Sequence, residues 1–227
     1  MPKIDDWNLQ LSNRIVKVVK SNGFLSAIAK GERGYGKSMY NLKTMAKVYY
    51  EVDGLSETDA WNKALDSFIF TPNQLLDRID YNINNEIISP VWCIDDATVH
   101  FSSYLYFINL YQASLVNAAF DTIRTVVSAM LLNCPNKKRL LGGLRFYDDY
   151  DISIYKDRGY VRRAVGIKWY SLPDGKRRFR KEFEDVFSCY VPDWVYEEYR
   201  PMRRKYLEDV TDKLEELSLK HESKKQP

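Results

Sequence analysis

Residues 31–38 read Gly-Glu-Arg-Gly-Tyr-Gly-Lys-Ser and match the phosphate-binding pattern G-x-x-x-x-G-K-[ST] at every fixed position. Glycines allow the tight turn in which successive backbone N–H groups converge on phosphate oxygens. In this pattern the lysine, here Lys37, reaches the β- and γ-phosphates, and the hydroxyl of Ser38 binds Mg²⁺. The stretch therefore predicts a nucleotide site. The residues expected to line it are Gly31, Glu32, Arg33, Gly34, Tyr35, Gly36, Lys37, Ser38 and Met39.

The sequence on either side of this phosphate loop supports the prediction. Residues 24–29 form a short apolar run typical of a buried strand, and residues 37–51 repeat apolar side chains at helical spacing. A helix that starts at the end of the loop directs its N-terminus at the bound anion. The order strand, loop, helix is the context that the pattern requires.

The composition is that of an ordinary globular protein, with 227 residues, 45% hydrophobic and 29% charged. No apolar run approaches the roughly 20 residues of a membrane-spanning helix, and the first residues lack the pattern of a signal peptide. We therefore expect a cytoplasmic protein without a membrane span. The net charge of +3 is too small to indicate nucleic-acid binding by itself, and three cysteines and two histidines are a poor supply of zinc ligands.

Strand-like and helix-like segments alternate as far as about residue 148, which predicts an α/β fold with a mainly parallel sheet flanked by helices. After the first strand, further strands are expected near residues 67–70, over 91–94 and over 129–132. Helices are expected over 5–22, 37–51, 60–68, 72–79 and 104–126, with a polar loop over 80–89.

From about residue 148 the pattern becomes that of an antiparallel β-hairpin extension. Its strand-like segments are 150–155, 161–172 and 178–191, with a turn at 173–175, and Pro192 opens a closing helix to about residue 219. The expected domains are an N-terminal helix over 1–22, a nucleotide-binding core over 23–191 that includes the hairpin (about 148–191), and a C-terminal helix with a charged tail over 192–227.

Acidic and polar residues end the strands expected after the loop. Asp95 and Asp96 follow an apolar run typical of a central parallel strand. Such a strand brings a carboxylate beside the serine-bound metal, so Asp95 is the candidate metal ligand with Ser38, and Asp96 the candidate base for the attacking water. Two aspartates here can instead cap the next helix. Asn133, at the end of the next strand, is a candidate contact to the γ-phosphate or the attacking water, or simply a turn residue.

Arginines flank the strand that ends at Asn133. Arg124, Arg139 and Arg145 are candidates to neutralise transition-state charge, in the same chain or across a subunit interface. An arginine in this role is worth about 10³–10⁵ in rate. Each of them can equally be solvated or structural. The expected catalytic set is Lys37, Asp96, Asn133, Arg124 and Arg145.

Three segments carry a family resemblance: residues 31–38, Val-Trp-Cys-Ile-Asp-Asp over 91–96, and Met-Leu-Leu-Asn over 130–133. With them the chain resembles P-loop NTPases of the additional-strand (ASCE) class, whose Walker A and Walker B motifs the first two segments match. It looks most like the small ATPases of archaeal plasmids and viruses, and more distantly like HerA/FtsK-type DNA motors. The motor families carry Asp-Glu where this chain has Asp95-Asp96.

The resemblance implies a Mg²⁺-dependent ATPase that acts as an oligomer and couples ATP hydrolysis to packaging, transfer or segregation of DNA in an archaeal virus or plasmid. Two alternatives stay open. A small-molecule kinase needs a mobile, arginine-rich lid, for which residues 136–147 supply the arginines. A slowly hydrolysing nucleotide switch or scaffold fits Asp96, whose side chain is shorter than the glutamate of the motor families.

Basic and aromatic residues interleave on the expected hairpin. Rings at Trp169, Tyr170 and Phe179 can stack on bases, while basic neighbours lie along a phosphate backbone. The alternative is a solvated hairpin whose charges pair with nearby acids, namely Glu182, Glu184 and Asp185. The candidate nucleic-acid contacts are Arg177, Arg178, Arg180 and Lys181.

Overall fold

The structure is a computed structural model, in which residues 4–98, 101–102, 110–146, 149–171 and 176–223 are described. The chain divides into two compact units, Met1–Tyr190 and Val191–Pro227. None of the described helices is both long and apolar enough to cross a membrane.

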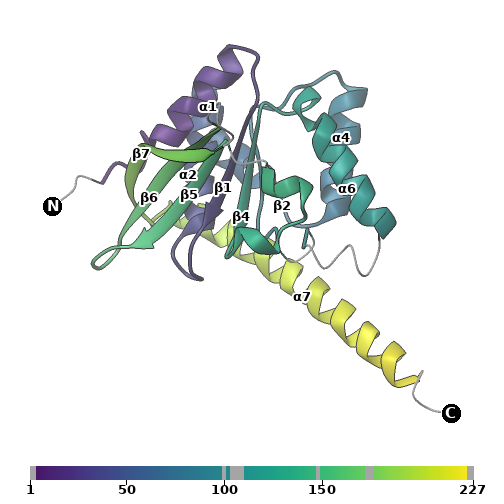
Figure 1. The fold of residues 1–227 in the computed structure, drawn as a ribbon. Helices are drawn as coiled ribbons and strands as arrows, with labels where there is room; N and C mark the ends of the chain where they lie inside the picture. Colours follow the sequence, from purple (N-terminus) through teal and green to yellow (C-terminus); the bar gives the residue numbers. More distant parts are fainter. Residues whose placement is uncertain (1–3, 99–100, 103–109, 147–148, 172–175, 224–227) are drawn as a thin grey trace. The chain divides into compact units, whose positions relative to one another are not determined.

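A seven-stranded sheet in the order β2-β3-β4-β1-β5-β6-β7 organises the first unit (Figure 1). The neighbours from β2 to β5 pair in parallel, whereas β5–β6 and β6–β7 pair antiparallel. The strands are β1 (Leu25–Lys30), β2 (Phe68–Ile69), β3 (Trp92–Ile94), β4 (Ala129–Cys134), β5 (Tyr150–Lys156), β6 (Val161–Ser171) and β7 (Arg177–Ser188).

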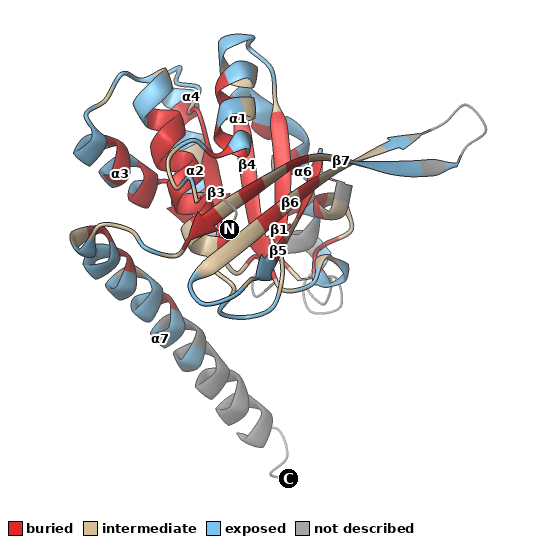
Figure 2. Ribbon diagram, turned by 90° about the vertical axis from the view of Figure 1, so that its left-hand side faces the viewer, coloured by how far each residue is buried: buried red, intermediate tan, exposed pale blue. Residues whose placement is uncertain are grey.

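Helices cover both faces of the parallel part of the sheet, and its central strands are buried (Figures 1 and 2). On one face, Ile28 and Met130 pack with Val116 and Phe120 of α6. On the other face, Asn41 of α2 bonds to residues of β3 and β4. The helices of this unit are α1 (Gln10–Lys20), α2 (Lys37–Val52), α3 (Glu57–Asp66), α4 (Pro72–Asn84) and α6 (Leu110–Thr122), with 3₁₀ turns at Ile123–Thr125, Lys137–Arg139 and Gly143–Phe146.

These elements confirm the predicted fold class, a mainly parallel α/β sheet with an antiparallel hairpin and a closing helix. The sheet order adds a relationship that local sequence patterns do not contain, because β4 lies between β1 and β3. The strand expected near residues 67–70 exists as β2, but it lies at the edge of the sheet.

The first helix begins at Gln10, later than the predicted residue 5. The segment before it is bonded to β7 instead, since Asp5 N donates to Val186 O at 3.1 Å. The carboxylate of Asp185 then accepts from the backbone N–H of Gln10 at 2.7 Å and of Leu11 at 3.4 Å. Helix α1 is therefore capped by a distant strand, and local sequence could not show this.

The predicted loop over residues 80–89 is partly wrong, because α4 continues to Asn84. Asn82 explains the extension. Its side chain is buried, and Nδ2 donates to Val126 O at 2.8 Å and to Ser89 Oγ at 2.9 Å. A polar residue that is typical of a loop in the sequence thus ties the end of the helix to the sheet.

Strand β5 belongs to the parallel core as well as to the extension, because it pairs in parallel with β1 and antiparallel with β6. The hairpin itself consists of β6 and β7. Its predicted turn at 173–175 lies outside the described residues, as does the first part of the helix predicted over 104–126. In the second unit, α7 (Asp193–Ser223) contains Pro201 and runs past the expected end at residue 219.

Candidate functional site

Three adjacent parallel strands have their carboxyl ends side by side, and each carries a residue predicted for the site at or just after this end. The phosphate loop follows β1, Asp95 follows β3, and Asn133 lies near the end of β4. The parallel register pairs Ala29 with Asn133 and Ile94 with Leu132, so the three ends are aligned. The open ends of parallel α/β strands are where such folds bind ligands.

The phosphate loop requires its glycines. Gly34 and Gly36 have φ values of 79° and 89°, a region that side chains with a Cβ avoid. A Cβ on Gly36 would meet Cys189 Sγ at 2.4 Å, and one on Gly31 would meet Ile154 O at 2.6 Å. Helix α2 starts from Gly36 without any capping side chain, which leaves its first N–H groups available to an anion.

Lys37 lies over the loop that precedes it. Its Nζ donates to the carbonyl oxygens of Gly31 and Glu32, each at 2.9 Å. The residue is only 9% exposed. The loop therefore holds its own ammonium group at the place where phosphate oxygens are expected.

Ser38, Asp95 and Asn133 form one hydrogen-bonded set. Ser38 Oγ donates to both carboxylate oxygens of Asp95, at 2.9 and 3.1 Å, and Asn133 Nδ2 donates to Asp95 Oδ1 at 2.8 Å. Asp95 is 2% exposed and Asn133 1% exposed. A hydroxyl and a carboxylate are hard oxygen ligands of the kind that Mg²⁺ takes, with waters and phosphate oxygens completing its shell. The residues present therefore fit Mg²⁺, with Ser38 and Asp95 to hold it.

No group of three or more His, Cys, Asp or Glu side chains suited to a metal occurs among the described residues. A structural metal site of the zinc type thus has no ligand set in this part of the chain. Mg²⁺ bound with a nucleotide does not need one, because it uses one or two protein oxygens and the substrate phosphates.

Asn41 is a member of the site that the sequence did not reveal. Its Nδ2 donates to Asn133 Oδ1 at 2.8 Å and lies 3.4 Å from Cys93 Sγ. A carboxylate accepts only, so Asn133 must turn its amide nitrogen to Asp95 and its oxygen to Asn41. The available signal was position, since Asn41 lies one helical turn after Lys37 on a helix whose neighbouring residues are buried.

Asp96 lies beside the set but adopts an unusual backbone. Its φ is +46°, and its backbone N–H donates to Asp95 Oδ1 at 3.1 Å. The next residue, Ala97, donates its N–H to Asn133 O at 2.8 Å, which joins the turn after β3 to β4. The turn therefore orients Asp95, and the part of Asp96 as a base stays a prediction.

The structure separates the candidate arginines. Arg124 precedes β4 and so lies at the amino end of this strand, whereas the phosphate loop lies at the carboxyl ends of the strands. The six residues of β4 span about 20 Å. Arg145 Nε donates to Leu140 O at 2.7 Å within its own segment. Arg139 lies in the 3₁₀ turn that follows β4 and is exposed. It is therefore at the same end of the strands as the phosphate loop. Arg124 is thus not brought to the loop within one chain.

Basic groups surround the end of β4. Burial and the charge of Asp151 raise the pKa of Cys134 to about 12, while Lys37, Lys30 and Lys137 act to lower it. Lys30 at the end of β1 is itself paired with Asp151, at 2.7 Å. Burial also raises the pKa of Cys93, so both thiols are protonated at neutral pH. Three lysine charges therefore act at the end of β4, and both thiols are in their unreactive, protonated form.

The loop residues Glu32, Arg33 and Tyr35 have no common role. Glu32 and Arg33 are exposed, and a hydrogen bond to Glu32 is the main cause of a raised pKa at Tyr35. Met39 lies half-buried in the first turn of α2. The carbonyl oxygen of Glu32 accepts a hydrogen bond from Lys37 Nζ.

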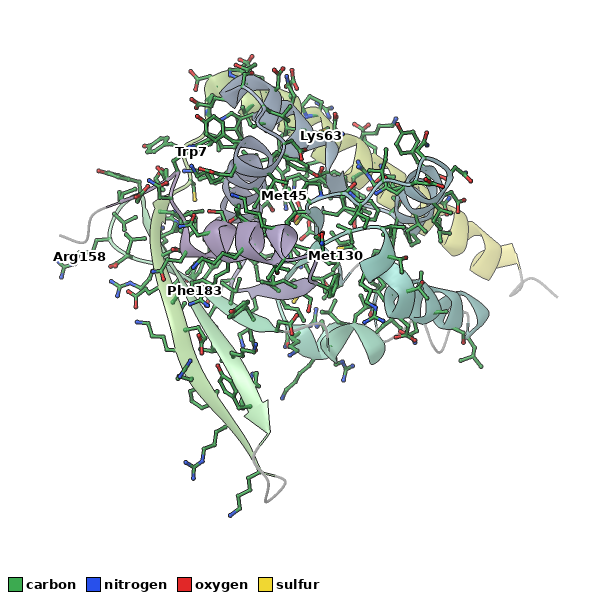
Figure 3. The ribbon with its side chains drawn as sticks, turned by 90° about the horizontal axis from the view of Figure 1, so that it is seen from above. Trp7, Met45, Lys63, Met130, Arg158 and Phe183 are labelled. Carbon is green, nitrogen blue, oxygen red and sulfur yellow. The ribbon has the colours of Figure 1, made fainter. Side chains whose placement is uncertain are left out.

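The β6–β7 hairpin extends away from the rest of the sheet, and its outer part is exposed (Figures 2 and 3). Arg178 is exposed, whereas Arg180 pairs with Glu182 at 2.7 Å and Lys181 pairs with Glu184. Asp185, expected as a third partner for these charges, caps α1 instead. The side chain of Arg177 lies outside the described residues.

Two viral proteins are similar in sequence to this chain. "Uncharacterized protein B-251" of Sulfolobus spindle-shape virus 1 is 28% identical over 227 aligned residues, covering 96% of this chain and 88% of that protein. "Uncharacterized protein ORF286" of Acidianus two-tailed virus is 28% identical over 155 residues, 67% of this chain and 51% of that protein, so the match spans about half its length. No protein-family model matches the chain.

Among solved structures, the N-terminal domain of zonular occludens toxin from Neisseria meningitidis aligns with a TM-score of 0.45 and 12% identity. The alignment covers 77% of this chain and 98% of that domain. The sheet itself defines the fold, which is mainly parallel α/β with helices on both faces. The chain is therefore similar in sequence to the two viral proteins named above and has a mainly parallel α/β fold.

Proposed function

We propose that the chain is a Mg²⁺-dependent ATPase of the additional-strand P-loop class, which handles DNA in an archaeal virus or plasmid. The observation that carries the proposal is the set in which Asp95 accepts from both Ser38 and Asn133. Lys37 lies on the loop beside this set. A phosphate loop alone supports nucleotide binding, whereas a loop joined to an acid and a polar strand end supports hydrolysis.

Each residue has a defined part in the proposed reaction. Lys37 and the first N–H groups of α2 would hold the phosphates, and Ser38 and Asp95 would hold Mg²⁺. When bound, Mg²⁺ neutralises charge on the β- and γ-phosphate oxygens. Asn133 contacts the γ-phosphate or the attacking water, and Asp96 orients and deprotonates that water.

The sheet order supports the additional-strand class. β4 lies between the loop strand β1 and the acid strand β3, and it carries Asn133 into the site. An arginine supplied by a second copy of the chain is consistent with the distant position of Arg124. Arg139 is the candidate arginine within one chain, because it follows β4 at the end of the strand where the phosphate loop lies. We propose the arrangement in which a second copy supplies the arginine, so the active form is a homo-oligomer.

DNA is the proposed second partner. The exposed hairpin carries Arg178, Arg180 and Lys181, with Phe179 64% exposed among them. Basic side chains along a projecting ribbon suit a phosphate backbone, and an exposed ring suits a base. The viral relatives agree with a role in a mobile genetic element.

The packing of the described part of residues 136–147 makes a kinase the weaker alternative. A lid must open, but Leu140, Leu141 and Leu144 of this segment are fully buried in the core. The nucleotide switch keeps support from Asp96, since its turn uses the backbone N–H to hold Asp95. Slow hydrolysis is the property that distinguishes the switch from a motor.

The proposal is tested by ATP turnover in the presence of Mg²⁺, with and without double- or single-stranded DNA. Wild-type protein should hydrolyse ATP faster with DNA, and Lys37→Ala should abolish turnover. Lys63→Ala, on the exposed surface of α3, is the matched lysine control and should behave as wild type. ATP binding without turnover under every condition would contradict the ATPase and support the nucleotide switch. The absence of ATP binding would contradict both the ATPase and the switch.

A further inference from the structure

We propose that Tyr160 and Tyr190 form the platform on which the base of the bound nucleotide stacks. The inference rests on the proposed nucleotide site and assigns its nucleoside end. Both tyrosines come from the end of the hairpin that lies nearest the phosphate loop, Tyr160 directly before β6 and Tyr190 two residues after β7.

The sheet order gives the direction of the nucleotide. Asp95 and Asn133 lie on the β3–β4 side of the loop strand β1, whereas β6 and β7 lie on its other side. A nucleotide whose γ-phosphate and Mg²⁺ are at Asp95 must extend its ribose and base away from that end. The strands on the other side of the loop are therefore where a base site is expected.

The hairpin touches the phosphate loop on that side. The space in front of Gly36 is bounded by Cys189 Sγ, Phe187 Cε2 and Arg162 Cγ, at 2.4, 3.6 and 3.9 Å from the position of a Cβ. Tyr190 follows Cys189 and Tyr160 is two residues from Arg162. Since consecutive Cα atoms are about 3.8 Å apart, each tyrosine starts within about 8 Å along the chain of a residue that contacts the loop.

The two rings are adjacent and uncovered. Their centroids are 5.8 Å apart with an interplanar angle of 54°, and the residues are 57% and 70% exposed. Each exposed tyrosine ring offers a flat apolar face with a polar edge, which suits a nucleobase. Because the two rings are tilted and their centroids are 5.8 Å apart, a base cannot lie between them. It stacks on the outer face of a ring.

Hydrogen bonds fix the backbone of both tyrosines. Arg162 Nη1 donates to Gly159 O at 3.0 Å and to Val161 O at 2.9 Å, the carbonyls on either side of Tyr160. Tyr190 N donates to Ser188 Oγ at 3.2 Å, and Ser188 is itself held by Asp6. The backbone that carries the rings is already ordered in the free protein. The stacking of a base therefore costs little further conformational entropy.

Arg162 links the platform to the phosphates. Its side chain lies between the turn that carries Tyr160 and the loop at Gly36, and its charge acts on Tyr35. Its Nε is buried and has no hydrogen-bond partner among the residues that the structure describes. A ribose or α-phosphate oxygen is a chemically suitable acceptor for it.

The test compares Mg²⁺-ATP with Mg²⁺-tripolyphosphate, which has the phosphates but no base, by titration calorimetry. The double variant Tyr160→Ala/Tyr190→Ala should bind ATP at least about tenfold more weakly, the loss expected of one stacked base, and tripolyphosphate as wild type does. Tyr160→Phe/Tyr190→Phe should keep the ATP affinity. Tyr81→Ala, an equally exposed tyrosine on α4, is the control and should change neither.

The outcomes separate this inference from the proposed function. Unchanged ATP affinity in the double alanine variant would overturn the platform and leave the phosphate site intact. Equal losses for ATP and tripolyphosphate would also overturn it, because they indicate a damaged loop. If wild-type protein bound neither ligand, the proposed function would fail, and the platform with it.

Discussion

Asn133 donates a hydrogen bond from Nδ2 to Oδ1 of Asp95 at 2.8 Å, and this bond joins the ends of β4 and β3. Asn133 Oδ1 in turn accepts from Asn41 on the helix that follows the phosphate loop. The acid, the polar strand end and the loop helix are therefore one connected network. Changes at Asn41 should act on Asp95 without touching the loop.

Asn41→Leu should lower the rate of ATP hydrolysis about 10- to 100-fold, the usual effect of removing a partner that orients a ligand. Leucine keeps the branched shape of asparagine but cannot donate to Asn133 Oδ1, so the amide of Asn133 loses one of the two bonds that orient it and is held by Asp95 alone. The affinity for ATP should change little, because Lys37 keeps its bonds to the loop. Steady-state kinetics and calorimetry measure the two effects separately.

A double-mutant cycle provides the control for this network. Asn133→Leu should lower the rate as Asn41→Leu does, and the double variant should lose little more, because residues in one network are not additive. Fully additive losses would show that the two asparagines act independently.

Several residues of the candidate site can be predicted from the sequence, because each belongs to a motif within its own segment of chain. The pattern at residues 31–38 and the acids after an apolar run define Lys37, Ser38 and Asp95, because each depends on its own segment. Asn41 and the separation of Arg124 from the loop depend on strand order, which a single sequence does not determine. The cap of α1 by Asp185 is of the same kind, since the two partners are 175 residues apart in the chain.

Gly36→Ala should destabilise the protein more than Gly34→Ala. Both glycines have positive φ, so each alanine carries about 1–2 kcal/mol of backbone strain. Only Gly36 faces a close neighbour, Cys189 Sγ, and crowding there should add about 1–3 kcal/mol. Urea unfolding measures both free energies of unfolding. Cys189→Ala in the Gly36→Ala background should restore part of the loss, and no recovery would contradict the proximity of the two residues.

Replacing Arg178, Arg180 and Lys181 by alanine should weaken binding to double-stranded DNA and flatten its dependence on salt. The logarithmic slope should fall by about 0.9 for each DNA phosphate that the protein no longer neutralises. Arg178 should contribute most, since the other two already pair with Glu182 and Glu184. Fluorescence anisotropy at several salt concentrations gives the slopes.

The matched control for the hairpin removes the same charge elsewhere. Lys17, Lys20 and Lys63 are exposed on α1 and α3, and their triple alanine variant should keep the wild-type slope. If both triple variants lost affinity equally, net charge and not the hairpin would be the cause.

The pH dependence of stability should reveal Asp185. Burial is the main cause that raises its pKa above the ordinary value of 3.8, although bonds from Gln10 and Tyr40 oppose it. The folded protein thus takes up a proton at higher pH than the unfolded chain. The free energy of unfolding of wild type, relative to Asp185→Ala, should be greatest below about pH 3.8 and fall as pH rises to the folded-state pKa.

Urea unfolding of both proteins across this pH range measures that difference. The variant should also be less stable overall by about 0.5–2 kcal/mol, because α1 loses its cap. A difference that grew with rising pH would contradict the direction of the shift.

The central claim is that Ser38, Asp95 and Lys37 form a Mg²⁺-nucleotide site that hydrolyses ATP. The most direct measurement is phosphate release by wild type and Asp95→Asn over a titration of Mg²⁺, with Lys63→Ala as control. Wild type and the control should release phosphate only with Mg²⁺, and Asp95→Asn should be at least about tenfold slower or require more Mg²⁺. Equal rates for wild type and Asp95→Asn at every Mg²⁺ concentration would contradict the claim.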